Sequence, residues 1–238
     1  MEEMTRRAFM KKSTTVLVGG ALGGAALTGL GSHPRTARAE VSVFPESQCG
    51  LPGSANPKVL VAYASMHGST GGVAEAVSLT LCAAGMTAEV RRVDHVTRIS
   101  GYDAVIVGSA VRSGRWLPEA VDFVQSYRDV LAERPVAYFL TCLALYRDTP
   151  KTRQTARGYM APVLEAVPKV VPRDVGLFTG VLDYERYNFV VRMIMKRKME
   201  KQGVPEGDHR NWERIRTWSR DLGPCLTGAE GKRAAGLS

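Results

Sequence analysis

The chain has 238 residues and a formal net charge of +9, and 45% of its residues are hydrophobic. This moderate basic excess favours anionic ligands or an anionic membrane surface without requiring either, and we expect no nucleic-acid partner. The four cysteines form no CxxC pair, which argues against a thiol redox motif and a structural zinc site, so no metal is expected.

Residues 1–39 are predicted to be an export signal. The run Thr5-Arg6-Arg7-Ala8-Phe9-Met10-Lys11 resembles the motif of twin-arginine signals, and Ala37-Arg38-Ala39 is a small-x-small cleavage site. The Gly- and Ala-rich run between them is short for a membrane anchor, although an uncleaved anchor is the alternative. Cleavage would remove six basic and two acidic residues and lower the net charge from +9 to +5. Because this route carries folded proteins, a cofactor could be inserted before export to the periplasm.

The elements of the mature chain follow in order. Residues 40–57 are rich in Pro, Gly and Ser and are predicted to form a linker. From Lys58, strand-like and helix-like patterns alternate. Strands are predicted at 59–65, 87–93, 104–110, 135–142 and 175–182, and helices at 70–84, 118–128, 152–166 and 209–222.

This alternation predicts an α/β domain over 58–225, with a C-terminal tail at 226–238. Strands separated by helices form a parallel sheet with helices on both faces. Five strands fit the doubly wound order 2-1-3-4-5, in which a ligand lies outside the carboxyl ends of the first and third strands.

The turn after the first strand is suited to an anion. It carries Ser65, His67, Gly68, Ser69 and Thr70 directly before a helix, where backbone N–H groups and the helix dipole favour a phosphate. There is no GxxxxGK[ST] and no GxGxxG after this strand, so neither common nucleotide fingerprint is present. A capped turn without a ligand is the alternative, since Ser and Thr are ordinary N-caps.

The loops after the third and fourth strands are suited to a planar ring. Residues 108–116 and 141–147 combine small residues with aromatic and basic ones. Trp116 and Tyr146 are candidates for stacking on such a ring. The alternative for Trp116 is that it only covers the following helix.

The segment Ser65-Met66-His67-Gly68-Ser69-Thr70 resembles the loop with which flavodoxins bind the phosphate of FMN. The resemblance covers roughly 58–222 and implies a flavodoxin-like fold that binds FMN. His67 stands where a small hydroxyl residue is common, so it contributes either its backbone N–H alone or its ring as well. The cofactor-binding residues implied are Ser65, His67, Gly68, Ser69 and Thr70 at the phosphate, and Ser109, Ala110, Val111, Arg112, Gly114, Trp116, Thr141, Cys142, Leu143 and Tyr146 at the isoalloxazine.

A narrower resemblance joins two separate regions of the chain. The loop 109–114 and the stretch LDYERYNFVVRMIMKRKMEKQG at 182–203 are similar to menaquinone-dependent protoporphyrinogen dehydrogenases, which are flavodoxin-like enzymes. Ordinary flavodoxins lack this basic insertion, placed at about 184–205. The resemblance implies an FMN-dependent oxidoreductase with a quinone as electron acceptor. Haem synthesis normally takes place in the cytoplasm, however, so export argues against a porphyrinogen substrate more than it argues against FMN binding.

The insertion has an amphipathic pattern. Residues 187–202 are compatible with a helix that places Val190, Met193 and Ile194 on one face and carries five basic residues. Such a segment can lie at a membrane interface, and a surface helix packed on the domain is the alternative.

The basic residues of the ring loops also bear on redox chemistry. Arg112, Arg115 and Arg147 would stabilise an anionic reduced flavin and raise its potential, which suits electron uptake from an organic substrate. We assign Arg112 to contact with a substrate carboxylate or the flavin, because its planar fork suits both.

Two other functions stay open at this point, an electron-transfer flavodoxin serving an extracytoplasmic redox protein and a flavodoxin-fold binding module without FMN. For the cysteines, an oxidising compartment would allow Cys49 to pair with Cys225, while Cys82 and Cys142 are expected to be buried thiols.

Overall fold

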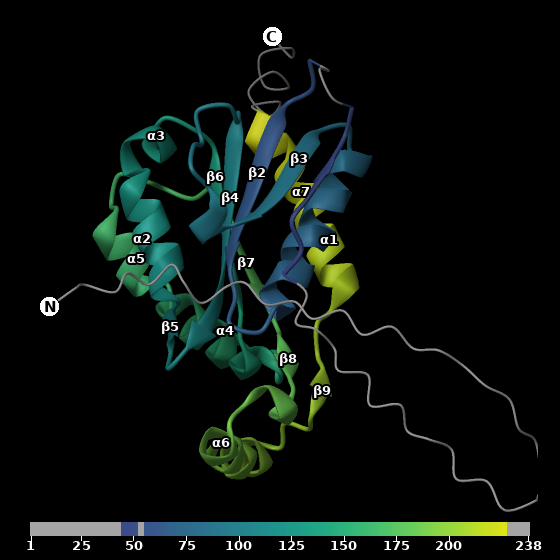
Figure 1. Cartoon of the computed structure of the whole chain (residues 1–238), viewed down its shortest axis with the longest axis vertical. Helices are drawn as coiled ribbons and strands as arrows, with labels where there is room; N and C mark the ends of the chain where they lie inside the picture. Colours follow the sequence, from purple (N-terminus) through teal and green to yellow (C-terminus); the bar gives the residue numbers. More distant parts are fainter. Residues whose placement is uncertain (1–43, 52–54, 228–238) are drawn as a thin grey trace, which may run out of the picture. The chain divides into compact units, whose positions relative to one another are not determined.

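The computed structural model describes residues 44–51 and 55–227. Within them, a sheet of seven strands has the order β1-β3-β2-β4-β6-β7, and β5 pairs with β4 (Figure 1). The strands are β1 (Ser47–Cys49), β2 (Lys58–Ala64), β3 (Thr87–Arg92), β4 (Ala104–Arg112), β5 (Arg115–Trp116), β6 (Val136–Thr141) and β7 (Val175–Phe178).

The five strands β3-β2-β4-β6-β7 are parallel and form the centre of the sheet. In chain order this is 2-1-3-4-5, which confirms the predicted flavodoxin-like arrangement. The central strands are buried on both sides, as their continuous apolar sequences require. The carboxyl ends of β2, β4 and β6 therefore meet at one end of the sheet.

Helices cover both faces of this sheet (Figure 1). On one face, α1 (Ser69–Ala83) and α7 (Trp212–Thr227) pack on Val61, Tyr63 and Phe139. The other face packs on Leu60, and its helices are α2 (Pro118–Ser126), α3 (Arg128–Ala132), α4 (Pro150–Gly158) and α5 (Ala161–Ala166). Two predicted helices are thus each divided in two, and the predicted strand at 175–182 is divided into β7 and a separate short strand.

The segment before β2 differs from the expected linker. Ser47–Cys49 forms β1, which pairs antiparallel with β3 at the edge of the sheet. The carbonyl of Pro45 accepts a hydrogen bond from the Tyr63 hydroxyl at 3.1 Å. Part of 40–57 therefore belongs to the folded domain, while residues 1–43, 52–54 and 228–238, which include the expected export signal and tail, lie outside the described residues.

The cysteine expectation is also corrected. Cys49 forms a disulfide with Cys82, not with Cys225, and so ties β1 to α1. The pairing follows from the fold, because β1 lies beside β3 while α1 packs across the same edge. Cys82 is therefore not the buried thiol that was expected, whereas Cys142 is buried and keeps its thiol, as expected. Cys225 also keeps its thiol.

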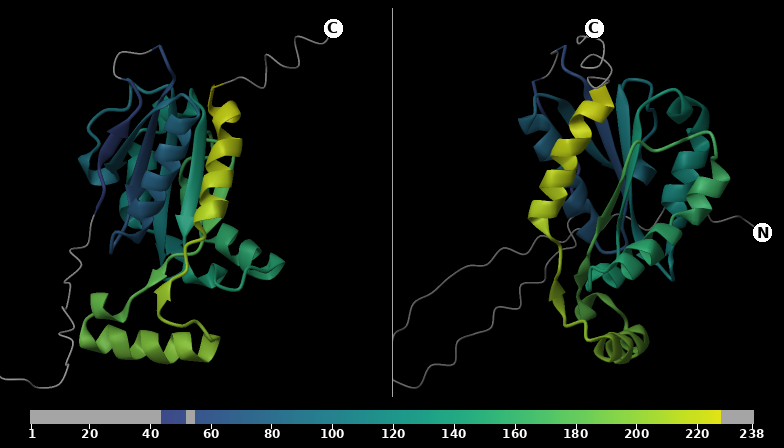
Figure 2. Two further views of the ribbon diagram at one scale, coloured as in Figure 1. Left: turned by 90° about the vertical axis from the view of Figure 1, so that its right-hand side faces the viewer. Right: turned by 180° about the vertical axis from the view of Figure 1, so that it is seen from behind.

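The insertion leaves and rejoins the domain through a two-stranded ribbon. Strands β8 (Val181–Leu182) and β9 (Gly207–Asp208) pair antiparallel, and α6 (Phe189–Gln202) lies between them. Asn188 caps α6 by accepting from the Val191 N–H, and Gly203 ends it in a left-handed conformation. Figure 2 shows α6 lying across the end of the domain.

The ribbon and α6 share a small apolar cluster of their own. Leu182, Met199 and Val204 are buried there, and Leu143 from the loop after β6 packs against them. The insertion is therefore docked on the carboxyl ends of the strands. Among the described helices, none has the length and apolar character needed to cross a bilayer.

Candidate functional site

The loop between β2 and α1 has the geometry of an anion cradle. Gly68 has φ of 83°, a left-handed conformation that glycine adopts without steric cost, and its N–H donates to Ser65 Oγ at 2.9 Å. In the described structure no side chain caps α1 at Gly68. The first N–H groups of a helix have no partner within it. The amino end of α1, beginning at Ser69, is therefore open to an anion.

This loop is joined to the end of β6. The hydroxyls of Thr70 and Thr141 lie 2.8 Å apart, and both side chains are buried. The predicted phosphate loop and one predicted ring loop are thus in direct contact.

His67 lies at the boundary between these two regions. Its ring meets Tyr187 edge-on, with centroids 5.3 Å apart. Burial, and to a lesser degree the positive charge of Arg186, lowers the pKa of His67, so the imidazole is neutral at pH 7. Its Nε2 atom is buried and has no hydrogen-bond partner among the described residues. A buried polar atom without a partner among the described residues is suited to a hydrogen bond with a polar ligand.

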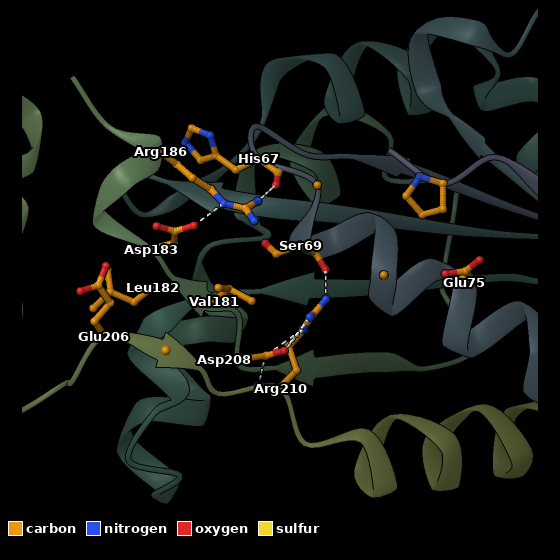
Figure 3. Close-up of a pocket in the computed structure, with 14 residues that line it drawn as sticks. His67, Ser69, Glu75, Val181, Leu182, Asp183, Arg186, Glu206, Asp208 and Arg210 are labelled. Atoms are coloured by element: carbon orange, nitrogen blue, oxygen red, sulfur yellow. Dashed lines mark hydrogen bonds and ion pairs between the residues drawn. The ribbon is translucent and has the colours of Figure 1, made fainter. Parts of the chain in front are cut away.

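Two arginines of the insertion contact the outer side of this loop (Figure 3). Arg186 follows β8 and donates to the backbone carbonyl of His67, while Arg210 follows β9 and donates to that of Ser69 at 3.2 Å. They line a pocket of about 470 Å³ that also contains the amino end of α1. Neither residue was expected at the site from the sequence, although Arg186 follows Asp183 by three positions and Arg210 follows Asp208 by two.

A second and larger pocket, of about 690 Å³, lies where the planar ring was expected. The loops after β4 and β6 and the insertion form its walls. Of the predicted ring-contact residues, it brings together Val111, Gly114, Cys142, Leu143 and Tyr146. Tyr146 is 37% exposed and meets His209 edge-on, so a face of its ring is available to this pocket.

Several predicted ring-contact residues lie elsewhere. Trp116 is 3% exposed and packs edge-on against Tyr138 in the core, so it does not stack on a ligand and instead has the alternative role of packing beneath the following helix. Ser109 is also buried, donating to the Ala110 carbonyl and accepting from the Leu117 N–H. These residues are internal because β4 is longer than predicted and turns back into β5.

Arg112 is likewise displaced from the predicted position. It is exposed at the β4–β5 turn, opposite Arg115, and is not among the residues that line the larger pocket. The positive charge there comes instead from Arg147, Lys198 and Lys201. The contact of Arg112 with a substrate or flavin therefore stays a prediction, while Arg147, Lys198 and Lys201 are the basic side chains that line this pocket.

The inner side of α6 forms one wall of the larger pocket, a role that was not expected from the sequence. The helix was expected to lie at a membrane interface or to pack on the surface of the domain. The four-residue spacings of Met195 with Met199 and of Lys198 with Gln202 are the signal that could have indicated a second, inward-facing side. The insertion contributes Tyr187, Met195, Lys198, Met199, Lys201, Gln202 and Val204 to the lining.

The thiol of Cys142 lines the same pocket. Burial raises its pKa to about 11, against the hydrogen bonds from the Leu145 and Ala144 backbone that lower it. The thiol is therefore protonated at neutral pH and is a poor nucleophile. Within the part of the chain that the structure describes, no group of three or more His, Cys, Asp or Glu residues is placed to hold a metal ion.

Comparison with known proteins agrees with this architecture. Residues 60–207 match the family model described as "Flavodoxin domain". Protoporphyrinogen IX dehydrogenase [quinone] of Escherichia coli (strain K12) is 24% identical over 176 residues, which cover 69% of this chain and 94% of that protein. The enzyme of the same name from Leishmania major is 25% identical over 184 residues, with 71% and 76% covered.

A solved short-chain flavodoxin associated with a non-canonical PDU bacterial microcompartment is 14% identical, covers 73% of this chain and 98% of its own, and has a TM-score of 0.43. The family model spans more than half of the chain and includes the phosphate loop, both ring loops and the insertion. The chain therefore belongs to the flavodoxin domain family.

Proposed function

We propose that the protein is an FMN-dependent oxidoreductase of the protoporphyrinogen dehydrogenase type that passes electrons to a quinone. The observation that carries this proposal is an open helix terminus at Ser69 whose next residue, Thr70, contacts the hydroxyl of Thr141. Thr141 directly precedes Cys142, which lines the larger pocket beside the basic insertion. Two curated relatives at 24% and 25% identity bear the name of that enzyme.

The proposed cofactor position follows from the two halves of the site. The phosphate of FMN would be held by the amino end of α1, with Gly68, Ser69 and the orphaned Nε2 of His67 around it. Its ring would lie in the larger pocket between the 111–114 loop and the loop after β6, beside Tyr146. When bound, FMN supplies the ability to accept and return electrons, which amino-acid side chains lack.

The basic groups of the pocket suit an acidic substrate. Arg147, Lys198 and Lys201 are the basic residues among its lining residues, and a porphyrinogen carries propionate carboxylates that cations can bind. Met195 and Met199 would contact its apolar macrocycle, since methionine adapts to irregular surfaces. The pocket thus offers the mixture of apolar and cationic contacts that this substrate class requires.

A quinone acceptor dissolves in membranes, and we propose that α6 brings the protein to one. Phe189 is 77% exposed, Val190 60% and Ile194 59%, which is unusual for large apolar side chains in contact with water. The basic residues of the same segment would attract an anionic surface, at about 1 kcal/mol each. Those that do not line the larger pocket are Arg192, Lys196 and Arg197.

Membrane contact can be tested by co-sedimentation with vesicles of phosphatidylglycerol and phosphatidylcholine. We expect binding that falls when Phe189→Ser and Ile194→Ser are combined, and that also falls with rising salt. Leu79→Ser is the matched control, because Leu79 is 57% exposed on α1, away from the insertion. Equal binding of the two variants would contradict the role of α6.

We also propose that the protein works after export to the periplasm. The Cys49–Cys82 disulfide supports this location, because disulfides persist in oxidising compartments and are rare in the cytosol. Fractionation of cells producing the full chain would test it. Recovery in the cytosol with Arg6 and Arg7 intact would contradict it.

The enzymatic proposal is tested by the visible spectrum of the purified protein, before and after reconstitution with FMN. We expect a flavin spectrum that survives desalting, followed by oxidation of protoporphyrinogen with a menaquinone analogue as acceptor. Gly68→Val is the control that should lose the flavin, because a β-branched residue is strained at φ of 83°. A protein that stays colourless would contradict FMN binding, and a yellow protein active only with a redox protein would indicate electron transfer instead.

A further inference from the structure

Two arginines of the insertion, Arg186 and Arg210, donate hydrogen bonds to the backbone of the phosphate loop. We propose that Arg186 and Arg210 are positioning residues that clamp the loop in its phosphate-binding conformation and couple it to the insertion. The inference rests on the proposed function in that the phosphate is taken to be that of FMN.

Each arginine is oriented by its own carboxylate. Arg186 Nε donates to Asp183 at 2.7 Å, while Arg210 holds both oxygens of Asp208, with Nη2 at 2.6 Å and Nε at 2.9 Å. Fork-shaped guanidinium groups fixed in this way keep a defined direction for their remaining donors. The donors are therefore aimed before any ligand arrives.

A second donor of each arginine, its Nη1 atom, contacts the backbone of the loop. Arg186 Nη1 donates to the His67 carbonyl, and Arg210 Nη1 donates to the Ser69 carbonyl at 3.2 Å. These carbonyls lie on either side of Gly68. A peptide plane whose carbonyl is held on one side keeps the N–H group of the following residue turned to the other. The clamp would thus hold the Gly68 N–H toward Ser65 Oγ, to which it donates, and would orient the Thr70 N–H at the amino end of α1.

The position of Arg210 is itself closely specified. Its guanidinium lies over the Trp212 ring, 4.3 Å from the centroid, and its side chain is only 17% exposed. A Cβ atom at Gly72 would approach its Nη1 to 2.6 Å, so the absence of a side chain at Gly72 permits the contact. Burial raises the pKa of Asp208, but the hydrogen bonds and charge of Arg210 outweigh it, so that this pKa lies below its usual value and the Asp208 carboxyl is ionised at neutral pH.

The two arginines reach the loop from the two sides of one ribbon. Arg186 follows β8 and Arg210 follows β9, and the ribbon is closed by pairing of Val181 with Asp208 and by the Tyr184 N–H donating to Glu206. The same ribbon carries α6, which walls the larger pocket. The clamp therefore links phosphate binding at one end of the site to the wall at the other end.

The test compares FMN with riboflavin, which lacks the phosphate. For Arg186→Gln and Arg210→Gln we expect the dissociation constant of FMN to rise about tenfold, while that of riboflavin changes less than about twofold. Arg210→Lys should show most of the loss, because it keeps the charge but lacks the fork that spans Asp208 and Ser69. Arg220→Gln, at an exposed site on α7, is the charge-matched control and should leave both ligands unaffected.

A second measurement does not depend on FMN. Amide hydrogen exchange of residues 66–71 in the ligand-free protein should be faster in both Gln variants than in wild type or Arg220→Gln. Equal losses for FMN and riboflavin, or unchanged exchange, would overturn the clamp. If wild type fails to bind FMN, the proposed function fails, and the exchange result alone supports or overturns the clamp.

Discussion

The central sheet and the insertion at 181–210 are stabilised in different ways. The sheet is held by continuous apolar burial, with Leu60, Val105 and Phe139 fully buried. The insertion has a cluster of three buried residues, a ribbon of two paired positions and two arginine–aspartate pairs. The difference leads us to expect that global stability depends mainly on the sheet and that the insertion can be altered without unfolding the domain.

The largest expected effect is a difference in the free energy of unfolding between two variants, each with one side chain truncated in one of the two regions. Phe139→Ala should lower the free energy of unfolding by about 3–5 kcal/mol, because Phe139 packs against Gly108, Phe178 and Trp218. Leu182→Ala should leave global unfolding in urea nearly unchanged, yet speed amide exchange in α6. Equal losses of global stability would show that the insertion and the sheet unfold as one unit.

The disulfide offers a second way to sharpen the comparison. Cys82→Ser should destabilise the domain by about 2–4 kcal/mol, because the bond to Cys49 closes a loop of 33 residues in the unfolded chain. The larger pocket, which neither β1 nor α1 lines, should keep its ligand affinity. Urea unfolding of Cys82→Ser beside Cys225→Ser, which keeps the disulfide, measures the effect, and a similar loss in both would contradict it.

A third effect concerns charge and should appear in the flavin alone. Lys198→Gln with Lys201→Gln should lower the midpoint potential of bound FMN on the order of tens of millivolts, since nearby cations favour the anionic reduced form. Lys196→Gln, outside the pocket lining, is the control. A potential that responds equally to Lys196→Gln would mean that only the overall charge matters. Global stability should not change in any of these variants.

The smallest expected effect is the pH response of His67, which lies where the two regions meet. Burial, with a smaller contribution from Arg186, lowers its pKa from the ordinary 6.5. Protonation of His67 therefore lowers the free energy of unfolding. Stability from the neutral ring is thus present above about pH 6.5 and is lost as the pH falls through the lower folded pKa. His67→Gln should flatten this acid loss in urea titrations between pH 7.5 and 5.5, and parallel curves would contradict it.

The same comparison explains what could be predicted from the sequence. The parallel strands and the loop at Ser65–Thr70 were predictable, because buried strands have unbroken apolar runs and helix starts have local signals. Trp116 was misplaced because its burial depends on the β4–β5 turn, which brings it over Tyr138.

Contacts that depend on tertiary structure were missed for a related reason. Arg186 and Arg210 lie 119 and 141 positions from their partners in the loop, a separation at which no periodicity gives information. The Cys49–Cys82 pair needed β1, which was read as linker, to lie at the sheet edge.

The antiparallel pairing of β8 with β9 has a consequence for how this protein could change over time. Because Val181 lies opposite Asp208, the insertion starts and finishes at neighbouring points of the domain. Lengthening, shortening or exchanging the segment between them adds only a small loop-closure entropy, which grows slowly with length. The segment between β8 and β9 could thus be replaced as a single contiguous stretch of chain. Such a replacement would change the ligands bound while the sheet and the phosphate loop stay the same.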